Sequence, residues 1–298
     1  MPIIAVGSVA YDGLKTPHGE RERVVGGSAT YFSIGASLFD RVNLVGVVGE
    51  NFDSKDMALF QSRNIALEGL DVQPGKTFFW KGEYGDNLNE AITHDTQLNV
   101  FAEFSPKIPE TYKDAEMVFL GNIHPALQGQ VIDAVGNGRF VACDTMNLWI
   151  NTTREALMDV IRRIDLLFVN DGEAHLLTGE SNTIKAARKI LDLGPSTVCI
   201  KRGEYGAAVL TRDDIALAPA FPMETVVDPT GAGDTFAAGF MGTLSRLGHQ
   251  NMDAFRQALK VGTVLSSFSI EAFSVERLKT VTLEEVDQRL DTFRQILA

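Results

Sequence analysis

The most informative segment of the chain is Asp228-Pro229-Thr230-Gly231-Ala232-Gly233-Asp234-Thr235. The β-branched residues Thr225, Val226 and Val227 precede it and indicate an extended segment or the end of a strand. Its two glycines allow the backbone to turn tightly, because they carry no Cβ. A helical run of apolar residues begins at Phe236 and stops at Gly248. We therefore expect a turn of small residues that opens into a helix, with Asp234 in the first helical turn.

This arrangement favours phosphoryl transfer. We expect the N–H groups of Gly231, Ala232 and Gly233 to point outward, because amides at a helix N-terminus lack partners and the helix dipole favours negative charge there. Asp234 can take the proton of a substrate hydroxyl while these amides hold the transferring phosphoryl group. The alternative is that Asp234 only caps the helix. The full heptapeptide D-P-T-G-A-G-D favours the catalytic interpretation over the cap.

Composition limits the partners of the chain. Its 298 residues are 45% hydrophobic, which is enough for a sizeable core in one large domain or two small ones. A formal net charge of −12 argues against nucleic-acid and anionic-membrane partners. The phosphates of a bound nucleotide must therefore be met locally by amides, a few basic side chains and a metal.

The two cysteines, Cys143 and Cys199, lie in apolar runs typical of strands. Without a C-x-x-C motif or a Cys/His cluster, a structural zinc site is not expected. Buried free thiols suit a reducing cytoplasm, where we expect the protein to work. The N-terminus lacks a basic region, and no apolar run approaches the roughly 18 residues of a membrane span.

Apolar segments of strand length alternate with helical patterns along most of the chain. The predicted strands are 3–9, 42–48, 117–120, 140–143, 166–169 and 197–201, and the predicted helices are 29–39, 54–63, 125–135, 154–164, 182–193 and a last one capped by Thr282 and Glu285. Such alternation predicts an α/β fold with a mostly parallel sheet covered on both faces.

Residues 77–104 break the alternation. Aromatic and polar residues alternate there without a helical period, which predicts short and partly exposed β-strands. Strands without a second layer must bury one face on substrate, on the core or on another subunit.

The segment 228–234 resembles the C-terminal signature of the ribokinase-like (PfkB) carbohydrate kinases, and the resemblance extends over nearly the whole chain. It implies a three-layer α/β/α fold within a single domain, 1–298, with a small β-strand lid near 10–25 and 76–104. It also implies transfer of the γ-phosphate of ATP to a hydroxymethyl group, with Asp234 as the base and Gly231–Gly233 as the anion hole. Family members often dimerise through the lid, so a homodimer is a hypothesis here.

The resemblance implies an acceptor site after the first strand. The spacing Gly7…Asp12 matches the G-x-x-x-x-D of the family, whose Asp binds substrate hydroxyls. Gly26 and Gly27 match a glycine pair that lets the backbone approach the sugar. The family then has an Asn where this chain has Tyr31, which could offer a phenol or a stacking face, or belong to the core. Asp144 with Asn147 resembles a D-x-x-N motif that is expected to touch substrate or phosphate.

The resemblance also implies sites for nucleotide and metal. Asn170 and Glu173 match the N-x-x-E that organises Mg²⁺ and its waters, although a helix cap explains the same residues. The turn at 201–206 corresponds to the nucleotide side, where Lys201 or Arg202 could meet phosphate oxygens and a solvated basic turn is the alternative. The predicted nucleotide site also includes Gly203, Gly206 and Thr230. Residues 262–273 would form one wall of its adenine pocket. Asp228 belongs to a monovalent-cation loop in many members, so K⁺ joins ATP and Mg²⁺ among the candidate cofactors.

The sequence thus predicts a sugar kinase. The alternative is a nucleoside kinase of the adenosine type, because Phe78, Phe79, Trp80 and Tyr31 could stack a base. A third class of function is a sugar sensor without enzymatic activity. The complete Asp234 motif argues against it, because a protein that only binds sugar needs no catalytic base. A nicotinamide oxidoreductase is excluded, because no G-x-G-x-x-G follows the first strand.

Overall fold

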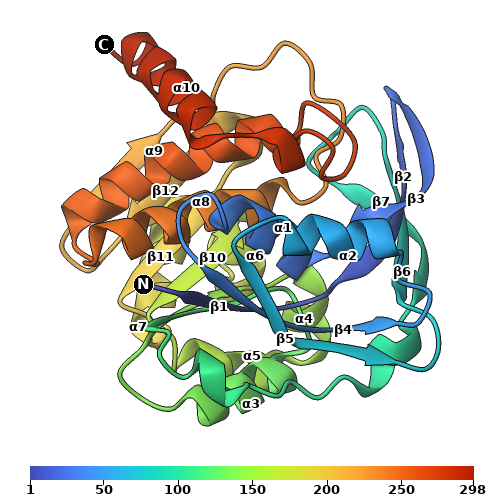
Figure 1. Ribbon diagram of the computed structural model, residues 1–298. Helices are drawn as coiled ribbons and strands as arrows, with labels where there is room; N and C mark the ends of the chain where they lie inside the picture. The colour runs from blue at the N-terminus through green and yellow to red at the C-terminus, as the bar shows by residue number, and fades with distance from the viewer.

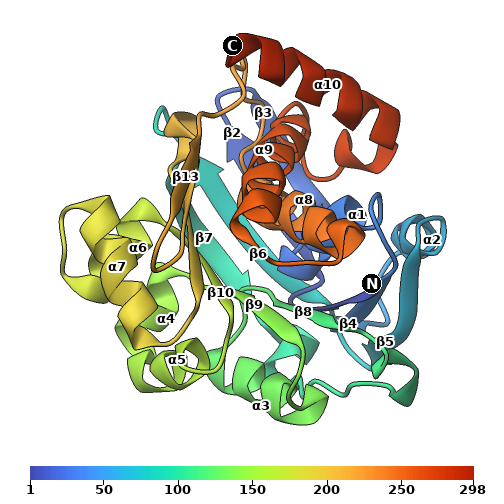
Figure 2. The same cartoon turned by 90° about the vertical axis from the view of Figure 1, so that its left-hand side faces the viewer.

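A nine-stranded sheet forms the centre of the molecule. The structure is a computed structural model and describes all 298 residues. The strand order is β13-β12-β11-β10-β9-β8-β1-β4-β5, which Figure 2 shows from one edge to the other. Seven strands are parallel: β1 (Ile3–Val6), β4 (Val42–Gly49), β5 (Ile65–Gln73), β8 (Met117–Leu120), β9 (Phe140–Asp144), β10 (Leu166–Asn170) and β11 (Thr197–Lys201). The antiparallel strands β12 (Ala207–Leu210) and β13 (Ile215–Ala218) close one edge.

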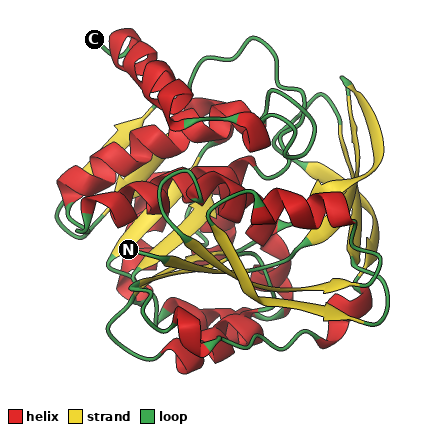
Figure 3. Cartoon of the chain, viewed as in Figure 1, coloured by secondary structure: helices red, strands yellow, loops and turns green.

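Helices cover both faces of this sheet (Figures 1 and 3). One face carries α1 (Ser28–Ala36), α8 (Ala232–Leu247), α9 (Met252–Ser269) and α10 (Leu283–Ile296), with α2 (Ser54–Gln61) beside them. The other carries α3 (Pro125–Val135), α4 (Asn147–Thr152), α5 (Arg154–Ile161), α6 (Asp171–Thr178) and α7 (Thr183–Leu193). The predicted three-layer α/β/α arrangement is confirmed.

Alternation along each strand separates the core into two halves. Leu166 and Phe168 of β10 join the cluster under α8 and α9, whereas Leu167 and Val169 join the cluster under α5 and α7. This period of two follows from the pleat of a strand. Near-continuous apolar runs are therefore required, because both faces are buried.

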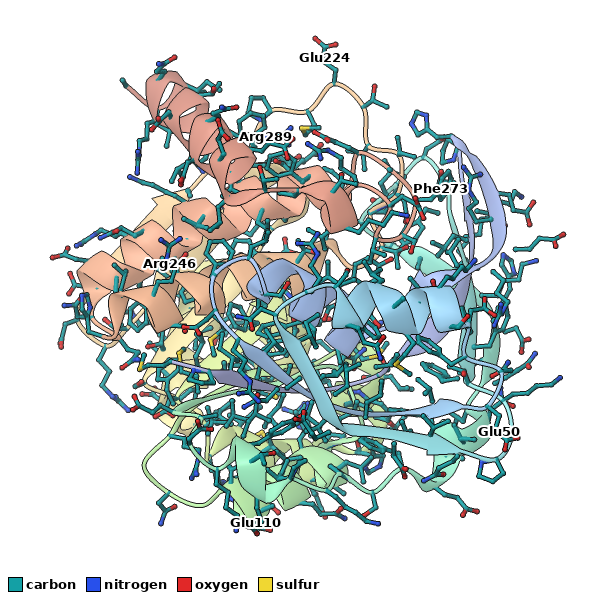
Figure 4. The ribbon with its side chains drawn as sticks, viewed as in Figure 1. Glu50, Glu110, Glu224, Arg246, Phe273 and Arg289 are labelled. Carbon is teal, nitrogen blue, oxygen red and sulfur yellow. The ribbon has the colours of Figure 1, made fainter.

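A second sheet of four strands stands at the end toward which the arrows of β4 and β5 point (Figure 1). Its order is β3 (Gly19–Gly26), β2 (Ala10–Thr16), β6 (Phe78–Tyr84) and β7 (Ala91–Gln97). These strands lie in the two segments expected to form the lid, except that β3 extends one residue further, to Gly26, and we call this sheet the lid. The tip of the β2–β3 hairpin lies beside Phe273 (Figure 4), where the Arg21 guanidinium carbon is 4.5 Å from the ring centroid.

The observed boundaries differ from the predicted ones in a few places. The apolar run 3–9 contains the end of β1 at Val6 and a break before β2, so it is not one strand. The helix predicted for 29–39 ends at Ala36, and β5, β12, β13 and α4 were not predicted. The capping box of Thr282 and Glu285 at the start of α10 is confirmed. None of the helices combines the length and the apolar character that a membrane span requires.

Candidate active site

The turn before α8 requires glycine at position 231. Gly231 is the N-cap residue and has φ 73, in the left-handed region that side chains with a Cβ disfavour. A Cβ there would also lie 2.3 Å from the ring of Tyr31. The close contact with Tyr31 and the backbone conformation together fix the start of α8 at the edge of the large sheet.

Two of the three amides expected to be free are free. The Ala232 N–H donates to the carbonyl of Pro229 at 3.2 Å, so the expectation of a free amide is wrong at this residue. The turn of the chain onto α8 causes this bond. The N–H groups of Gly231 and Gly233 donate to no group of the protein. These two amides and the positive end of the α8 dipole can bind an anion.

Asp234 lies in the first turn of α8 but does not cap it. The N-cap residue is Gly231, and no side chain accepts a hydrogen bond from the first amides of the helix. Burial raises the pKa of Asp234 to about 8, and the nearby carboxylate of Asp144 acts in the same direction against Lys201. A carboxylate with a raised pKa is a suitable proton acceptor near neutral pH.

Lys201 places a positive charge beside the free amides. Its Nζ lies 2.5 Å from Oδ2 of Asp144, and the side chains of Lys201 and Asp144 are 18% and 7% exposed. The same Nζ would be 3.0 Å from a Cβ at Gly233. Burial opposes the charge of Lys201, but Asp144 and Glu173 outweigh it and raise its pKa. The ammonium thus faces the amide turn.

Asp144 has a different neighbour from the one expected. The Thr145 N–H donates to its Oδ1 at 2.9 Å, and Lys201 holds Oδ2. Each carboxylate oxygen therefore has one partner within the protein and can accept a further hydrogen bond, so the contact with substrate or phosphate stays a prediction. Asp144 holds Lys201 in position.

The lid brings Asp12 to the other side of the site. Asp12 is 4% exposed, and a Cβ at Gly26 would be 1.9 Å from its Oδ2. Gly27 has φ 95, and a Cβ there would be 2.4 Å from the carbonyl oxygen of Ser8. Gly26 therefore makes the space for Asp12, and Gly27 allows the close approach of the backbone to Ser8. Burial raises the pKa of Asp12 to about 8, with a further contribution from Asp228.

Tyr31 is buried and offers no stacking face in this structure. Its side chain is 1% exposed, and its ring lies against Gly231. Its hydroxyl has no hydrogen-bond partner. Burial raises the pKa of Tyr31, and the charges of Asp228 and Asp12 raise it further. The phenol is therefore near two acidic side chains.

Asp228 ties two loops together. It is 0% exposed, its Oδ1 accepts from the Thr230 N–H at 2.9 Å, and its Oδ2 accepts from the Ser274 N–H at 2.8 Å. Burial raises the pKa of Asp228. The loop that follows α9 is thereby held against the start of the 228–234 segment, the place of the predicted monovalent-cation loop.

Asn170 and Glu173 form a reciprocal cap on α6. The Glu173 N–H donates to Asn170 Oδ1 at 2.7 Å, and the Asn170 N–H donates to Glu173 Oε2 at 2.8 Å. The cap that was the alternative to a metal site is present. Burial raises the pKa of Glu173 to about 7, against the effect of Lys201. The second oxygen, Oε1, makes no hydrogen bond, and no three metal-binding carboxylates, histidines or cysteines cluster in the chain.

The lid reaches both the amide turn and the predicted nucleotide turn. Thr230 Oγ1 donates to the Tyr84 hydroxyl at 3.3 Å. Asn89, in the β6–β7 connection, lies against Gly203, where a Cβ would be 2.2 Å from its Oδ1. Gly203 and Gly206 have φ 52 and 86, which explains two glycines in this turn. Sequence reasoning did not find Tyr84 or Asn89 as site residues, because no local pattern tells which lid side chains face inward.

Three comparisons place this geometry among known proteins. The model of the pfkB family of carbohydrate kinases matches residues 3–279. The chain is 30% identical over 253 residues to a cytidine kinase of Thermococcus kodakarensis, covering 83% of this chain and 89% of the relative. A nucleoside kinase structure from Methanocaldococcus jannaschii has a TM-score of 0.78 at 21% identity, with 98% of each chain covered.

A third similar structure contains a nucleotide. It is an E. coli protein described as a ribokinase II, in complex with ATP and Mg²⁺, with a TM-score of 0.81 at 18% identity and 97% and 99% of the two chains covered. At such low identity the two structural comparisons establish the fold. The family match over 277 residues establishes more: the chain belongs to the pfkB family of carbohydrate kinases.

Proposed function

We propose that this kinase transfers the γ-phosphate of ATP to the hydroxymethyl group of a sugar or sugar derivative, with Asp234 as the general base. The observation that carries the proposal is the position of Asp234 beside two free amides and a buried ammonium. Gly231, Gly233 and Lys201 surround the place where negative charge develops during transfer.

The residues of the chain divide the work between two sides of the site. Asp12, on lid strand β2, holds the acceptor through its hydroxyl groups, and Asp234 removes the proton of the attacking one. On the other side, Lys201 and the amides of the turn stabilise the transferring group. The turn with Gly203 and Gly206 lines the nucleotide-binding site together with Thr230. Asp144 keeps Lys201 in place.

Mg²⁺ is part of the proposal. Nucleotide-bound Mg²⁺ neutralises phosphate charge and keeps several waters, so it needs few protein ligands. Asn170 and the free Oε1 of Glu173 are hard oxygen donors that fit such an ion through its waters. K⁺ would bind at the loop that Asp228 and Ser274 close, because that buried carboxylate has no basic partner in the chain.

A nucleoside is the second candidate acceptor, and two observations favour it. Trp80 is the register partner of Asp12 in the lid, so the indole lies on the same face as the carboxylate and is partly exposed. Bases stack well on such rings. The relative that is 30% identical is a cytidine kinase.

Two further parts of the proposal concern the protein as a whole. The buried free thiols of Cys143 and Cys199 support a reducing compartment such as the cytoplasm. A homodimer would use the outer face of the lid. Sedimentation of a monomer at micromolar concentration would exclude it.

The function is tested with a panel of sugars and nucleosides. The purified chain is incubated with ATP, Mg²⁺ and each acceptor, and ADP and the phosphorylated product are both measured. At least one acceptor should give equal amounts of the two. If none is phosphorylated although ATP binds, the proposal is wrong, and ATP consumption without a phosphorylated product would indicate hydrolysis alone.

A further inference from the structure

The tip of the lid lies on the turn that is predicted to hold the nucleotide. This tip is the connection between β6 and β7, residues 85–90. A Cβ built on Gly203 would be 2.2 Å from Oδ1 of Asn89, 3.1 Å from its Cγ and 3.5 Å from its Nδ2. The whole carboxamide of Asn89 therefore lies against the backbone of this turn, and glycine at position 203 makes the contact possible.

The Asn89 carboxamide is free to bind a ligand. A hydrogen bond within the tip holds the residue, because the N–H of Asn89 donates to Oδ1 of Asn87 at 3.1 Å. The side-chain Oδ1 and Nδ2 of Asn89 make no hydrogen bond within the protein, and water satisfies them because the residue is exposed. The nitrogen of a carboxamide carries two N–H donors. Packing against a glycine does not use these donors, so they remain available to a bound group.

The same sheet reaches the other parts of the site. Asp12 lies on β2, on the acceptor side, and Tyr84 at the end of β6 accepts from Thr230 Oγ1 at 3.3 Å, beside the amide turn. Gly203 follows Lys201, whose ammonium faces that turn, by two residues. The lid therefore extends from the acceptor across the transferring group to the nucleotide turn, and phosphates held on that turn would lie under its tip.

Asn89 is suited to a phosphate although the tip has no basic residue. Hydrogen bonds to an ionised oxygen are about twice as strong as those between neutral groups, so an uncharged amide binds phosphate well. The charged side chains of the tip, Asp86 and Glu90, are both exposed, so water screens them. The carboxamide of Asn89, in contrast, is in contact with the turn.

We propose that Asn89 is a nucleotide-binding residue, and that its Nδ2 donates a hydrogen bond to a β- or γ-phosphate oxygen of ATP held on the turn of Gly203 and Gly206. The inference rests on the proposed kinase function and adds a residue of the lid to the nucleotide site. Because β2 of the lid also carries Asp12, one sheet contacts both substrates when they are bound.

Three variants of the full chain test this contact by calorimetric titration with the β,γ-imido analogue of ATP and Mg²⁺. Asn89→Ala removes the donor and should raise the Kd of the analogue about tenfold, as the loss of a hydrogen bond to a charged group does. Asn89→Asp keeps the shape of the side chain but places a carboxylate against the phosphates, so it should raise the Kd further. The control Glu90→Gln removes a charge from the exposed neighbouring residue and should change the Kd by less than about twofold.

The order of the two Asn89 variants separates a phosphate contact from packing alone. If the side chain only packed on Gly203, Asn89→Asp would retain that packing and bind the analogue like the parent. A parental Kd in either Asn89→Ala or Asn89→Asp would therefore overturn the proposal. The Tm of all three variants should equal that of the parent, because the substituted residues are exposed, so a change in Kd reports binding and not unfolding.

The titrations separate this inference from the proposed function. A chain that shows the expected order of Kd values but phosphorylates no acceptor would refute the function and support the role of Asn89. Phosphorylation of an acceptor together with equal Kd values in the parent and the Asn89 variants would support the function and refute that role. A parent chain that does not bind the analogue would refute both.

Discussion

Replacing Asp144 by Asn tests the role assigned to the buried ion pair. The change keeps the shape of the side chain but removes the charge that lies 2.5 Å from the Lys201 ammonium. Removing one partner of a buried pair leaves the other uncompensated, which costs about 3–5 kcal/mol. Glu173 and Asp234 also act on Lys201, so the lower end, about 3 kcal/mol, is expected.

That loss is large enough to measure. For a chain of this size it corresponds to a decrease in Tm of roughly 6 °C. The control is Asp159→Asn, which removes the same charge from a pair with Arg162 whose side chains are 73% and 57% exposed. Exposed pairs contribute at most about 1 kcal/mol, so the Tm of this variant should stay near that of the parent.

The same substitution should move the pH dependence of the reaction. Asp144 is the charged neighbour that raises the pKa of Asp234 most, and Lys201 without its partner would lower it further. The acidic limb of kcat/KM, which reports the free enzyme, should therefore shift below the value of about 8 expected for the parent. A variant with the Tm and the acidic limb of the parent would refute the role of the pair.

Three other predictions follow from the geometry of the site. Burial raises the pKa of Asp12 and Asp234 to about 8, so the folded state holds these two protons more tightly than the unfolded state does. The stability that this difference provides is lost as pH rises through 8. The Tm without ligand should therefore fall from pH 6 to 9, and it should fall less steeply in Asp12→Asn. Gly231→Ala should lower the free energy of unfolding, measured by chemical denaturation, by about 2–4 kcal/mol, because its Cβ would meet the Tyr31 ring at 2.3 Å and φ is unfavourable. The control Gly138→Ala, with φ 89 and open space around it, should lower it by only about 1–2 kcal/mol. Equal losses in the two variants would contradict the clash. Glu173→Gln should raise the Mg²⁺ concentration for half-maximal rate about tenfold, and an unchanged Mg²⁺ titration would leave the residue with its capping role alone.

Local sequence patterns predicted the architecture but not every strand at the edges of the large sheet. Apolar runs and capping signals identified most buried strands and helices, since a doubly covered sheet leaves strong periodicity in the sequence. β5 was missed because Glu68 and Asp71 interrupt its apolar pattern, which an edge strand with one exposed side tolerates.

Contacts between distant segments were the part that the sequence could not supply. Lys201 and Asp144 are 57 residues apart, and Thr230 and Tyr84 are 146 apart, so neither pair has a local signature. The motif located Asp234 and the glycine turn, but it did not show that the Ala232 amide is used within the turn. The direction in which the Tyr31 side chain points depends on the position of α1 relative to α8, which no local pattern predicts.

The most direct test of the account is the rate of phosphoryl transfer by Asp234→Asn. With the acceptor and ATP both saturating, we expect single-turnover transfer to fall by about 10²–10⁴-fold, the usual contribution of a general base. The Tm should be equal to or above that of the parent, because a buried carboxylate has been replaced by a neutral amide. Transfer at a near-parental rate in the folded variant would contradict the assignment of the base and with it the proposed mechanism.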